Sequence, residues 1–196
     1  MNFLAHLFLS GDDEDLLIGN MIADFLSNKD LPMYSPAVQR GIALHRQIDS
    51  YTDQHPIVRK GTLRLQPYHH KYSPVVVDIF YDYFLLKNWE SYGDIPLPQF
   101  SQKVYLILER RMDEMPTRLK EQLPKMIASD WLLSYGTMEG LSFVFHKLEE
   151  RAAFNNRFGE APIHLLRYYD AFNEEFNIFF PEVLAFVKNF RENAFG

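Results

Sequence analysis

The sequence predicts an all-α protein, a single-domain helical bundle over residues 1–196. Ser-Pro pairs at Ser35-Pro36 and Ser73-Pro74 each precede a long segment rich in apolar residues. Such pairs are typical helix starts, because Ser caps a helix and Pro suits its first turn. No segment alternates apolar and polar residues as a half-buried strand does. With 196 residues, 47% of them hydrophobic, the chain is long enough to bury one substantial core.

The first half of the chain is expected to form a short buried segment followed by four helices. The buried segment is helical or extended, and a loop and a histidine-bearing connection separate the later helices. The expected ranges are 1–9 for the buried segment, 15–27, 36–53, 57–65 and 73–89 for the helices, 28–34 for the loop and 66–72 for the connection. The helix over 73–89 is apolar on nearly every side, which predicts a central position in the fold.

The second half is expected to be helical as well. Its expected helices cover 99–114, 117–135, 138–153 and 163–193. Pro124 is expected to kink the second of these helices and Pro181 to interrupt the last, because Pro lacks an N–H donor and collides with the preceding turn. The aromatic side chains of the last helix fit core packing better than a cofactor site.

Polar residues follow one side of the helix predicted over 36–53. His45, Asp49 and Asp53 are spaced four residues apart, so they lie along one side of that helix. Arg46 precedes Asp49 by three positions and can reach it. Apolar neighbours flank this line, which predicts that it faces inward or into a cleft. An imidazole and two carboxylates in such a place require compensation.

Asp78 and Asp82 form a second pair at four-residue spacing, on the predicted central helix. Two ionised carboxylates in apolar surroundings repel each other and lose hydration, so a cation must meet them or one must stay protonated. Either a divalent ion supplies the charge, or Arg46 pairs with Asp49 or Asp78 in a structural network. For the set as a whole the metal interpretation is favoured, because few cationic side chains lie nearby in the sequence.

Histidine and carboxylate side chains in a chain without cysteine suit Mn²⁺ or Mg²⁺, and Zn²⁺ less exclusively. Such an ion lowers the pKa of a bound water and polarises a phosphoryl oxygen. Further candidates are less specific. Taken singly, His6 fits a core histidine and Asp24 a solvated carboxylate. Of the adjacent His69 and His70, at most one is expected to meet a given site.

Composition narrows the function. No apolar run is long enough to cross a bilayer, and no basic segment precedes the N-terminal apolar stretch as in a signal peptide. The absence of cysteine is consistent with a cytoplasmic location. The net charge of −6 disfavours nucleic acid as a partner. We therefore expect neither a membrane nor a nucleic-acid partner, and the sequence indicates no oligomeric state.

Four segments, in this order along the chain, resemble the acyl carrier protein phosphodiesterases, a family described as divergent relatives of the HD-domain metal phosphohydrolases. The segments are MNFLAHLFLS at 1–10, GNMIADF at 19–25, GIALHRQIDSYTD at 41–53 and VVVDIFYDYFL at 75–85. The resemblance implies an HD-domain-like enzyme of fatty acid biosynthesis and lipid metabolism that uses Mn²⁺, or another divalent cation such as Mg²⁺. It implies hydrolysis of the phosphodiester between 4′-phosphopantetheine and a serine of holo-acyl carrier protein, which leaves the apo protein.

Applied to the matching positions, the resemblance implies roles for individual residues. The implied metal ligands are Asp24, His45, Asp49 and Asp78. Arg46 would neutralise the phosphoryl oxygens, which a planar guanidinium matches well. Asp53 and Asp82 would orient the ligands or act as bases. Because Arg46 follows His45, the literal His-Asp dyad of HD proteins is absent.

Two other functions fit the same motifs. An HD-like metal phosphohydrolase acting on a small molecule, such as a nucleotide, would differ only in its substrate. A non-enzymatic helical binding protein would use the polar line as a structural network. Metal content separates the binding protein from both enzymes, and release of phosphopantetheine from holo-acyl carrier protein separates the two enzymes from each other.

A basic patch is expected to dock the proposed partner. Acyl carrier proteins are strongly acidic and this chain is itself net acidic, so their association requires a local patch of positive charge. The expected patch is Arg59, Lys60 and Arg64, on the helix that follows the His45 motif. An ordinary solvated basic helix is the alternative.

Overall fold

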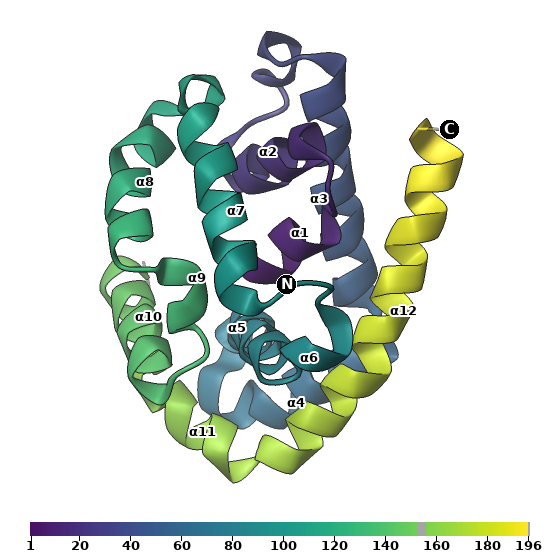
Figure 1. Cartoon of the computed structure of the whole chain (residues 1–196). Coiled ribbons are helices and arrows are strands. Elements are labelled where there is room, and N and C mark those ends of the chain that lie inside the picture. The colour runs from purple at the N-terminus through teal and green to yellow at the C-terminus, as the bar shows by residue number, and fades with distance from the viewer. Residues whose placement is uncertain (153–155, 196) are drawn as a thin grey trace.

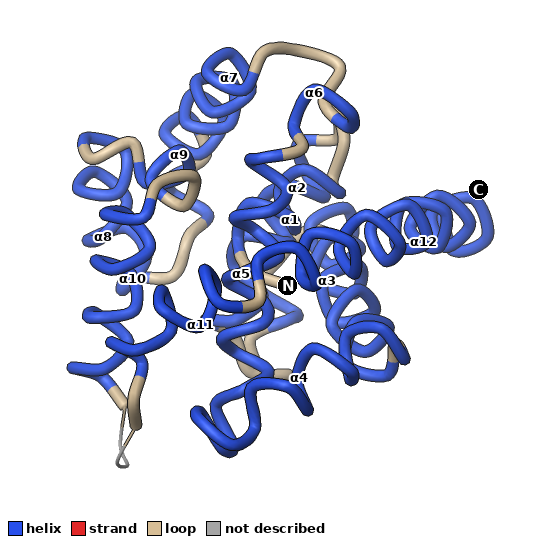
Figure 2. The backbone as a smooth tube through the Cα atoms, turned by 90° about the horizontal axis from the view of Figure 1, so that it is seen from below, coloured by secondary structure: helices blue, strands red, loops and turns tan. Residues whose placement is uncertain are grey.

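The computed structural model describes residues 1–152 and 156–195, and every regular element within these ranges is a helix (Figure 1). The tube view in Figure 2 shows the same helices from below, joined by short loops. The all-α prediction is confirmed. The likeness to HD domains stays a prediction. No helix in the described ranges has both the length and the apolar character that crossing a membrane would require.

The described residues form twelve α-helices and five 3₁₀ turns, joined by loops. The α-helices are α1 (Phe3–Leu9), α2 (Glu14–Ile22), α3 (Pro36–Gln54), α4 (Pro56–His69), α5 (Ser73–Lys87), α6 (Trp89–Tyr92), α7 (Leu97–Arg110), α8 (Thr117–Ala128), α9 (Trp131–Ser134), α10 (Met138–Arg151), α11 (Ala161–Arg167) and α12 (Tyr169–Phe195). The 3₁₀ turns are η1 (Ala23–Phe25), η2 (Leu31–Met33), η3 (His70–Tyr72), η4 (Met112–Glu114) and η5 (Phe158–Glu160).

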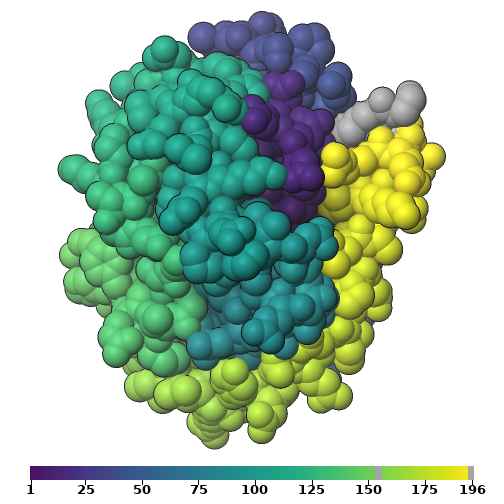
Figure 3. Space-filling model, viewed as in Figure 1, coloured from purple at the N-terminus to yellow at the C-terminus, as the bar shows by residue number. Residues whose placement is uncertain are grey.

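α5 lies at the centre of the molecule, as its all-round apolar sequence predicts. Every residue from Ile79 to Leu86 is buried. α1 is also buried, and the structure resolves this segment as a helix. On the face of the molecule that Figure 3 shows, the N-terminal residues appear as a narrow purple strip between the teal helices and the yellow α12.

Two glycines let α2 and α3 pack backbone against backbone. A Cβ atom on Gly19 would lie 2.3 Å from the carbonyl oxygen of Val38, and one on Gly41 would lie 2.6 Å from that of Leu16. Any larger residue would push the helices apart, because real Cβ atoms do not approach other atoms so closely. This close crossing holds α2 and the adjoining η1 against the face of α3 that carries His45.

Both Ser-Pro pairs mark the start of a helix as predicted, but only one of the two serines caps its helix. Ser35 caps α3, with its hydroxyl accepting the N–H of Val38 at 3.2 Å. Ser73 instead lies inside the first turn of α5, where its hydroxyl donates to the carbonyl oxygen of His70 at 2.7 Å.

Of the breaks predicted at proline, the one at Pro181 was wrong, and some helix ends differ from the expected ones. α4 runs through Pro67 to His69, so the predicted connection over 66–72 is helical. α12 continues through Pro181, because the aromatic residues around it are buried in the core and outweigh the roughly 3 kcal/mol cost of a proline inside a helix. α8 contains Pro124 and ends later, before Asp130, whose φ of 45° is left-handed. The expected end of α10, Ala153, lies outside the described residues.

Candidate functional site

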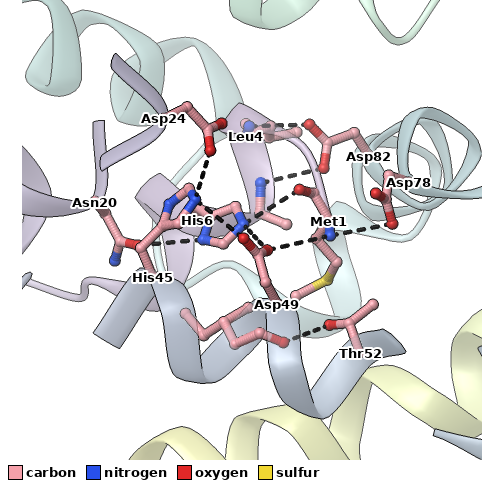
Figure 4. Close-up of polar contacts among 12 residues, drawn as sticks. Met1, Leu4, His6, Asn20, Asp24, His45, Asp49, Thr52, Asp78 and Asp82 are labelled. Carbon is pink, nitrogen blue, oxygen red and sulfur yellow. Dashed lines mark hydrogen bonds and ion pairs between the residues drawn. The ribbon is translucent and has the colours of Figure 1, made fainter. Parts of the chain in front are cut away.

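Two histidines and an aspartate from two helices, α1 and α3, form the centre of the candidate site (Figure 4). His6 of α1 and His45 of α3 stack with their ring centroids 4.0 Å apart and their planes 19° apart. Asp49 lies against both rings, with Oδ1 3.0 Å from His6 Nε2 and Oδ2 3.1 Å from His45 Nε2. One donor atom from each of these three residues falls within 4.8 Å of the other two. We call these three residues the His–Asp cluster.

Asp24 extends the His–Asp cluster towards solvent. Its Oδ1 lies 3.1 Å from His45 Nε2, and its side chain is 64% exposed. η1 follows α2 directly, so the glycine-mediated packing of α2 on α3 carries Asp24 to His45. Three of the four implied metal ligands, Asp24, His45 and Asp49, are therefore brought together.

A buried hydrogen-bond chain orients the ring of His6. The Asn20 amide donates to Ser10 Oγ at 2.8 Å, and the Ser10 hydroxyl donates to the carbonyl oxygen of His6 at 2.9 Å. This fixes the Asn20 carbonyl oxygen towards His6 Nδ1, 3.1 Å away. His6 Nδ1 therefore carries a proton, since it faces an acceptor.

The two stacked rings have opposite pKa shifts. Burial lowers the pKa of His6 to about 4, assisted by the charge of neighbouring His45. Burial also opposes the charged form of His45, but hydrogen bonds to Asp24 and Asp49 overcome it and raise its pKa to about 9. The pKa of the Asp49 carboxylate lies below its ordinary value, chiefly because the hydrogen bond from His45 counters the desolvation of the carboxylate. One imidazole of the stack is thus charged at neutral pH and the other is neutral.

Asp78 lies next to the His–Asp cluster without contacting its imidazoles. The amino group of Met1 is 3.1 Å from Asp78 Oδ1 and 3.8 Å from Asp49 Oδ1, so a cation stands between the two carboxylates. Burial raises the pKa of Asp78, although the Met1 amino group opposes that shift. The implied ligand Asp78 is therefore at the edge of the cluster.

A cleft of about 590 Å³ opens beside these groups. Asp24 and Asp78 both line it, together with Met1. Its remaining wall comes largely from apolar side chains of α5, α8, α9 and α10. The cleft thus reaches Asp24, which contacts His45 of the His–Asp cluster, and its volume is within the range of ligand-binding pockets.

The structure gives Asp82 a role different from the expected base. Its carboxylate is fully buried and accepts the backbone N–H groups of Leu4 at 2.9 Å and Ala5 at 3.3 Å. Asp82 therefore binds the first turn of α1, whose N–H groups have no partner within the helix. Because its oxygens are occupied and sealed from the cleft, Asp82 cannot reach a substrate.

Arg46 and Asp53 do not join the His–Asp cluster. Arg46 is exposed and forms no ion pair with any described residue. It lines neither the 590 Å³ cleft nor a second groove that Asp53, Arg59 and Asp78 line. The expected pairing of Arg46 with Asp49 or Asp78 is therefore not seen. Asp53 is exposed and, with Asp78, lines that second groove of about 600 Å³ on the other side of α5.

The paired histidines His69 and His70 lie elsewhere. His69 is buried and its Nε2 is 2.9 Å from Nδ1 of His164 on α11, whereas His70 is exposed. As the sequence predicts, the two side chains point to different surroundings. Neither contacts the His–Asp cluster, so both are removed from the candidate site.

The expected docking patch is partly a structural ion pair. Arg64 binds the buried Glu175 of α12 through two hydrogen bonds of 2.6 Å, and Lys60 lies 3.3 Å from the same carboxylate. Arg64 is half-buried and neutralised, so it cannot steer a partner. Arg59 is exposed and lines the groove beside Asp53 and Asp78.

Sequence reasoning missed Asn20 and Ser10 and undervalued His6. His6 is buried, as a core histidine would be, yet it also faces Asp49. Its partners lie 14 and 43 positions away, so no spacing rule within one helix could reveal them.

The fold and the cluster define an all-helical protein with a candidate histidine–carboxylate centre beside a cleft that Asp24 and Asp78 line. Residues 1–183 match the family model for acyl carrier protein phosphodiesterase. A protein of that name from Enterobacter sp. (strain 638) is 28% identical over 190 residues, which cover 96% of this chain and 98% of that protein. Proteins of the same name from Salmonella dublin and Salmonella newport (strain SL254) are 30% identical over 186 residues, which cover 94% of this chain and 96% of each.

This chain belongs to the acyl carrier protein phosphodiesterase family and is a hydrolase. The resemblance found in its four sequence segments is confirmed. No solved structure matches the chain.

Proposed function

We propose that the protein hydrolyses the phosphodiester between 4′-phosphopantetheine and the serine of holo-acyl carrier protein, using a divalent cation, Mn²⁺ or Mg²⁺, bound at the His–Asp cluster. Family membership and the names of the relatives support the substrate. The proposal places the reaction in the cytoplasm and in lipid metabolism. The cluster geometry supports the cation, by the following argument.

The observation that carries the metal proposal is the orientation of His6. Its Nδ1 bears the proton donated to Asn20, so in the neutral ring the lone pair of Nε2 points at Asp49 Oδ1, 3.0 Å away. The carbonyl oxygen of Met1 lies 3.2 Å from the same nitrogen. Acceptors facing each other at this distance repel, and a second proton on His6 is disfavoured because burial lowers its pKa to about 4. A cation bound among these atoms would remove the repulsion.

The donor set fits such an ion. Two imidazole nitrogens and one carboxylate, from His6, His45 and Asp49, converge without cysteine, Asp24 adds a carboxylate on His45, and Asp78 adds one at the edge. Mixed nitrogen and oxygen donors suit Mn²⁺, and metal-binding histidines commonly donate their other ring N–H to an oxygen, as His6 does to Asn20. When bound, the ion would polarise a phosphoryl oxygen and activate a water.

The remaining residues position and protect the site. Asn20 holds the His6 ring in one tautomer, and Asp82 holds the first turn of α1 that carries His6. The apolar side chains of the cleft limit water around the reacting bond, which strengthens electrostatic interactions there. Loss of the proton on His45 accompanies cation binding in this proposal, because a ligand nitrogen must be deprotonated.

The test is incubation of the purified protein with holo-acyl carrier protein in the presence of Mn²⁺. Mass spectrometry should show conversion of the carrier to its apo form, and free 4′-phosphopantetheine should appear in equal amount. A chelator should stop the reaction, and added Mn²⁺ should restore it.

Other outcomes separate the alternatives. Hydrolysis of nucleotides with the carrier left intact would indicate a small-molecule phosphohydrolase. Tight carrier binding with no metal uptake and no hydrolysis would indicate a binding protein. Full activity after metal removal would contradict the proposed cation but not the proposed substrate.

A further inference from the structure

One wall of the 590 Å³ cleft concentrates positive charge in an acidic protein. The cationic side chains lining the cleft are Arg118 of α8 and Lys147 and Arg151 of α10. The carboxylates lining it, Asp24 and Asp78, come instead from η1 and α5. α8 and α10 follow each other along one edge of the molecule, with α8 above α10 in Figure 1. We call this side of the cleft the α8–α10 wall.

Two of these cations are available to a partner. Arg118 and Arg151 are exposed and form no ion pair with any residue in the described ranges. Lys147 is partly neutralised, since its Nζ lies 2.8 Å from Glu150. This distinguishes the α8–α10 wall from the Lys60–Arg64 region, where the buried Glu175 already takes up the charge.

The same cleft carries exposed apolar side chains. Phe143 of α10 is 61% exposed and Val75 of α5 is 39% exposed, and both line the cleft. Lys147 Nζ lies 5.7 Å from the centroid of the Phe143 ring. An exposed aromatic ring among arginines is typical of a protein-binding surface, where Phe and Arg are enriched.

We propose that the α8–α10 wall binds the acidic surface of the carrier protein, so that its prosthetic group enters the cleft towards Asp24 and Asp78. The proposal rests on the proposed function for its partner. The wall shares its cleft with Asp24, whose Oδ1 lies 3.1 Å from His45 Nε2 of the His–Asp cluster, so a carrier bound through Arg118 and Arg151 presents its phosphodiester beside the cluster. Exposed cations steer an anionic partner and set the rate of its encounter.

The test is the double charge reversal Arg118→Glu, Arg151→Glu. At low salt the KM for holo-carrier should rise at least about tenfold, and the increase should shrink in high salt as screening weakens the interaction. kcat at saturating carrier should stay within about threefold of wild type, because the arginines act on encounter and not on the bond. Hydrolysis of bis(p-nitrophenyl) phosphate, a small diester, should be unchanged.

The matched control is Lys87→Glu, Lys188→Glu, which makes the same charge change at exposed positions on α5 and α12 that line neither side of this cleft. It should leave the KM for holo-carrier within about twofold of wild type. Phe143→Ser is the second variant. It should raise the same KM without changing the salt dependence, and circular dichroism should show that all variants fold.

Two results would overturn the proposal. The KM for holo-carrier could stay unchanged in both the arginine and the Phe143 variants while wild type releases phosphopantetheine normally. Alternatively, turnover of the small diester could fall as far as turnover of the carrier, which would place the arginines in the reaction itself. Failure of wild type to release phosphopantetheine would instead refute the proposed function, and this proposal with it.

Discussion

Two histidine pairs pack inside this molecule, and their surroundings differ. His6 and His45 stack 4.0 Å apart, with Asp49 bridging the two rings and Asp24 on one of them. His69 and His164 are joined directly, nitrogen to nitrogen at 2.9 Å, and among the described residues neither has a carboxylate hydrogen bond. The ring of Tyr68 stacks on His164 instead.

The carboxylates explain why one pair is a candidate site and the other is not. Burial disfavours charge at both pairs, and at His69 it lowers the pKa to about 4. At His45 the hydrogen bonds to Asp24 and Asp49 reverse the effect and raise the pKa to about 9. A histidine pair alone is a polar contact between two helices. In the pair that shares Asp49, His45 is charged and the lone pair of His6 Nε2 faces a carboxylate oxygen. A bound cation would remove that repulsion.

Replacing the shared carboxylate should give the largest effect. Asp49→Asn keeps the shape of the side chain but removes the charge between His6 and His45. It should abolish Mn²⁺-dependent hydrolysis. The loss of activity should exceed the roughly 100-fold loss expected when a group that only orients a metal ligand is removed. Turnover of holo-carrier and Mn²⁺ calorimetry measure it.

The second histidine pair supplies the control. His69→Gln can keep an N–H donor towards His164, and activity should stay within about threefold of wild type because the pair has no catalytic role. Equal losses in Asp49→Asn and His69→Gln, with equal losses of helical circular dichroism, would show that both pairs act only on the fold.

The sequence predicted those parts of the site that depend on one helix. The spacing of His45 and Asp49 within α3 placed both on one face, and the apolar run of α5 placed it at the centre. His6, Asn20 and Ser10 could not be found this way, because their meeting depends on how α1 packs among α2, α3 and α5. Asp82 was misassigned for the same reason, since its partner is the start of another helix.

The two carboxylates Glu175 and Asp49 can be compared in the same way. Glu175 binds an arginine, Arg64, whereas Asp49 lies against two histidines. Arg64→Ala leaves the buried Glu175 with only Lys60 nearby. The free energy of unfolding should fall by about 3–5 kcal/mol, the cost of stranding a buried charge. Denaturant unfolding measures this, and activity below the melting temperature should be retained. A loss of activity with unchanged stability would instead show that Arg64 takes part in binding the carrier or in the reaction.

Asp82 tests what burial does to a carboxylate without a histidine. Burial raises its pKa to about 7, against the opposing effects of the Met1 amino group and of the N–H groups of Leu4 and Ala5. Between about pH 4 and pH 7 the folded protein therefore holds a proton on Asp82 that the unfolded chain has lost. More protons bound in the folded state mean that the stability contributed by this group falls as pH rises through that range.

Asp82→Asn should remove this pH dependence. The stability of wild type relative to the variant should decline between pH 4 and pH 7 by up to about 4 kcal/mol, which is three pKa units at 1.36 kcal/mol each. Urea unfolding of both proteins at several pH values measures the difference, so that other titrating groups cancel. A difference that is constant with pH would show that Asp82 is ionised throughout.

The smallest of these effects is expected from Asn20, which gives the outer nitrogen of His6 a partner that those of His45 and His69 lack among the described residues. Asn20 accepts the N–H of His6 Nδ1, whereas Nδ1 of His69 has no partner among the described residues. Asn20→Ala should let the His6 ring change tautomer and weaken Mn²⁺ binding by roughly 10–100-fold, as expected for a group that orients a metal ligand. Calorimetry with Mn²⁺ measures the affinity without relying on activity.

Asn173→Ala is the control for Asn20→Ala, because Asn173 and Asn177 of α12 form an amide network with Asn88, which lies between α5 and α6, and none of the three contacts the His–Asp cluster. Both variants lose hydrogen bonds and should lose about 1–3 kcal/mol of stability. Mn²⁺ affinity should fall in Asn20→Ala alone. If the two variants lose affinity equally, general loosening of the fold explains the effect, and the tautomer argument for a metal at His6 fails. If Asn20→Ala loses stability but binds Mn²⁺ as wild type does, His6 is not a ligand.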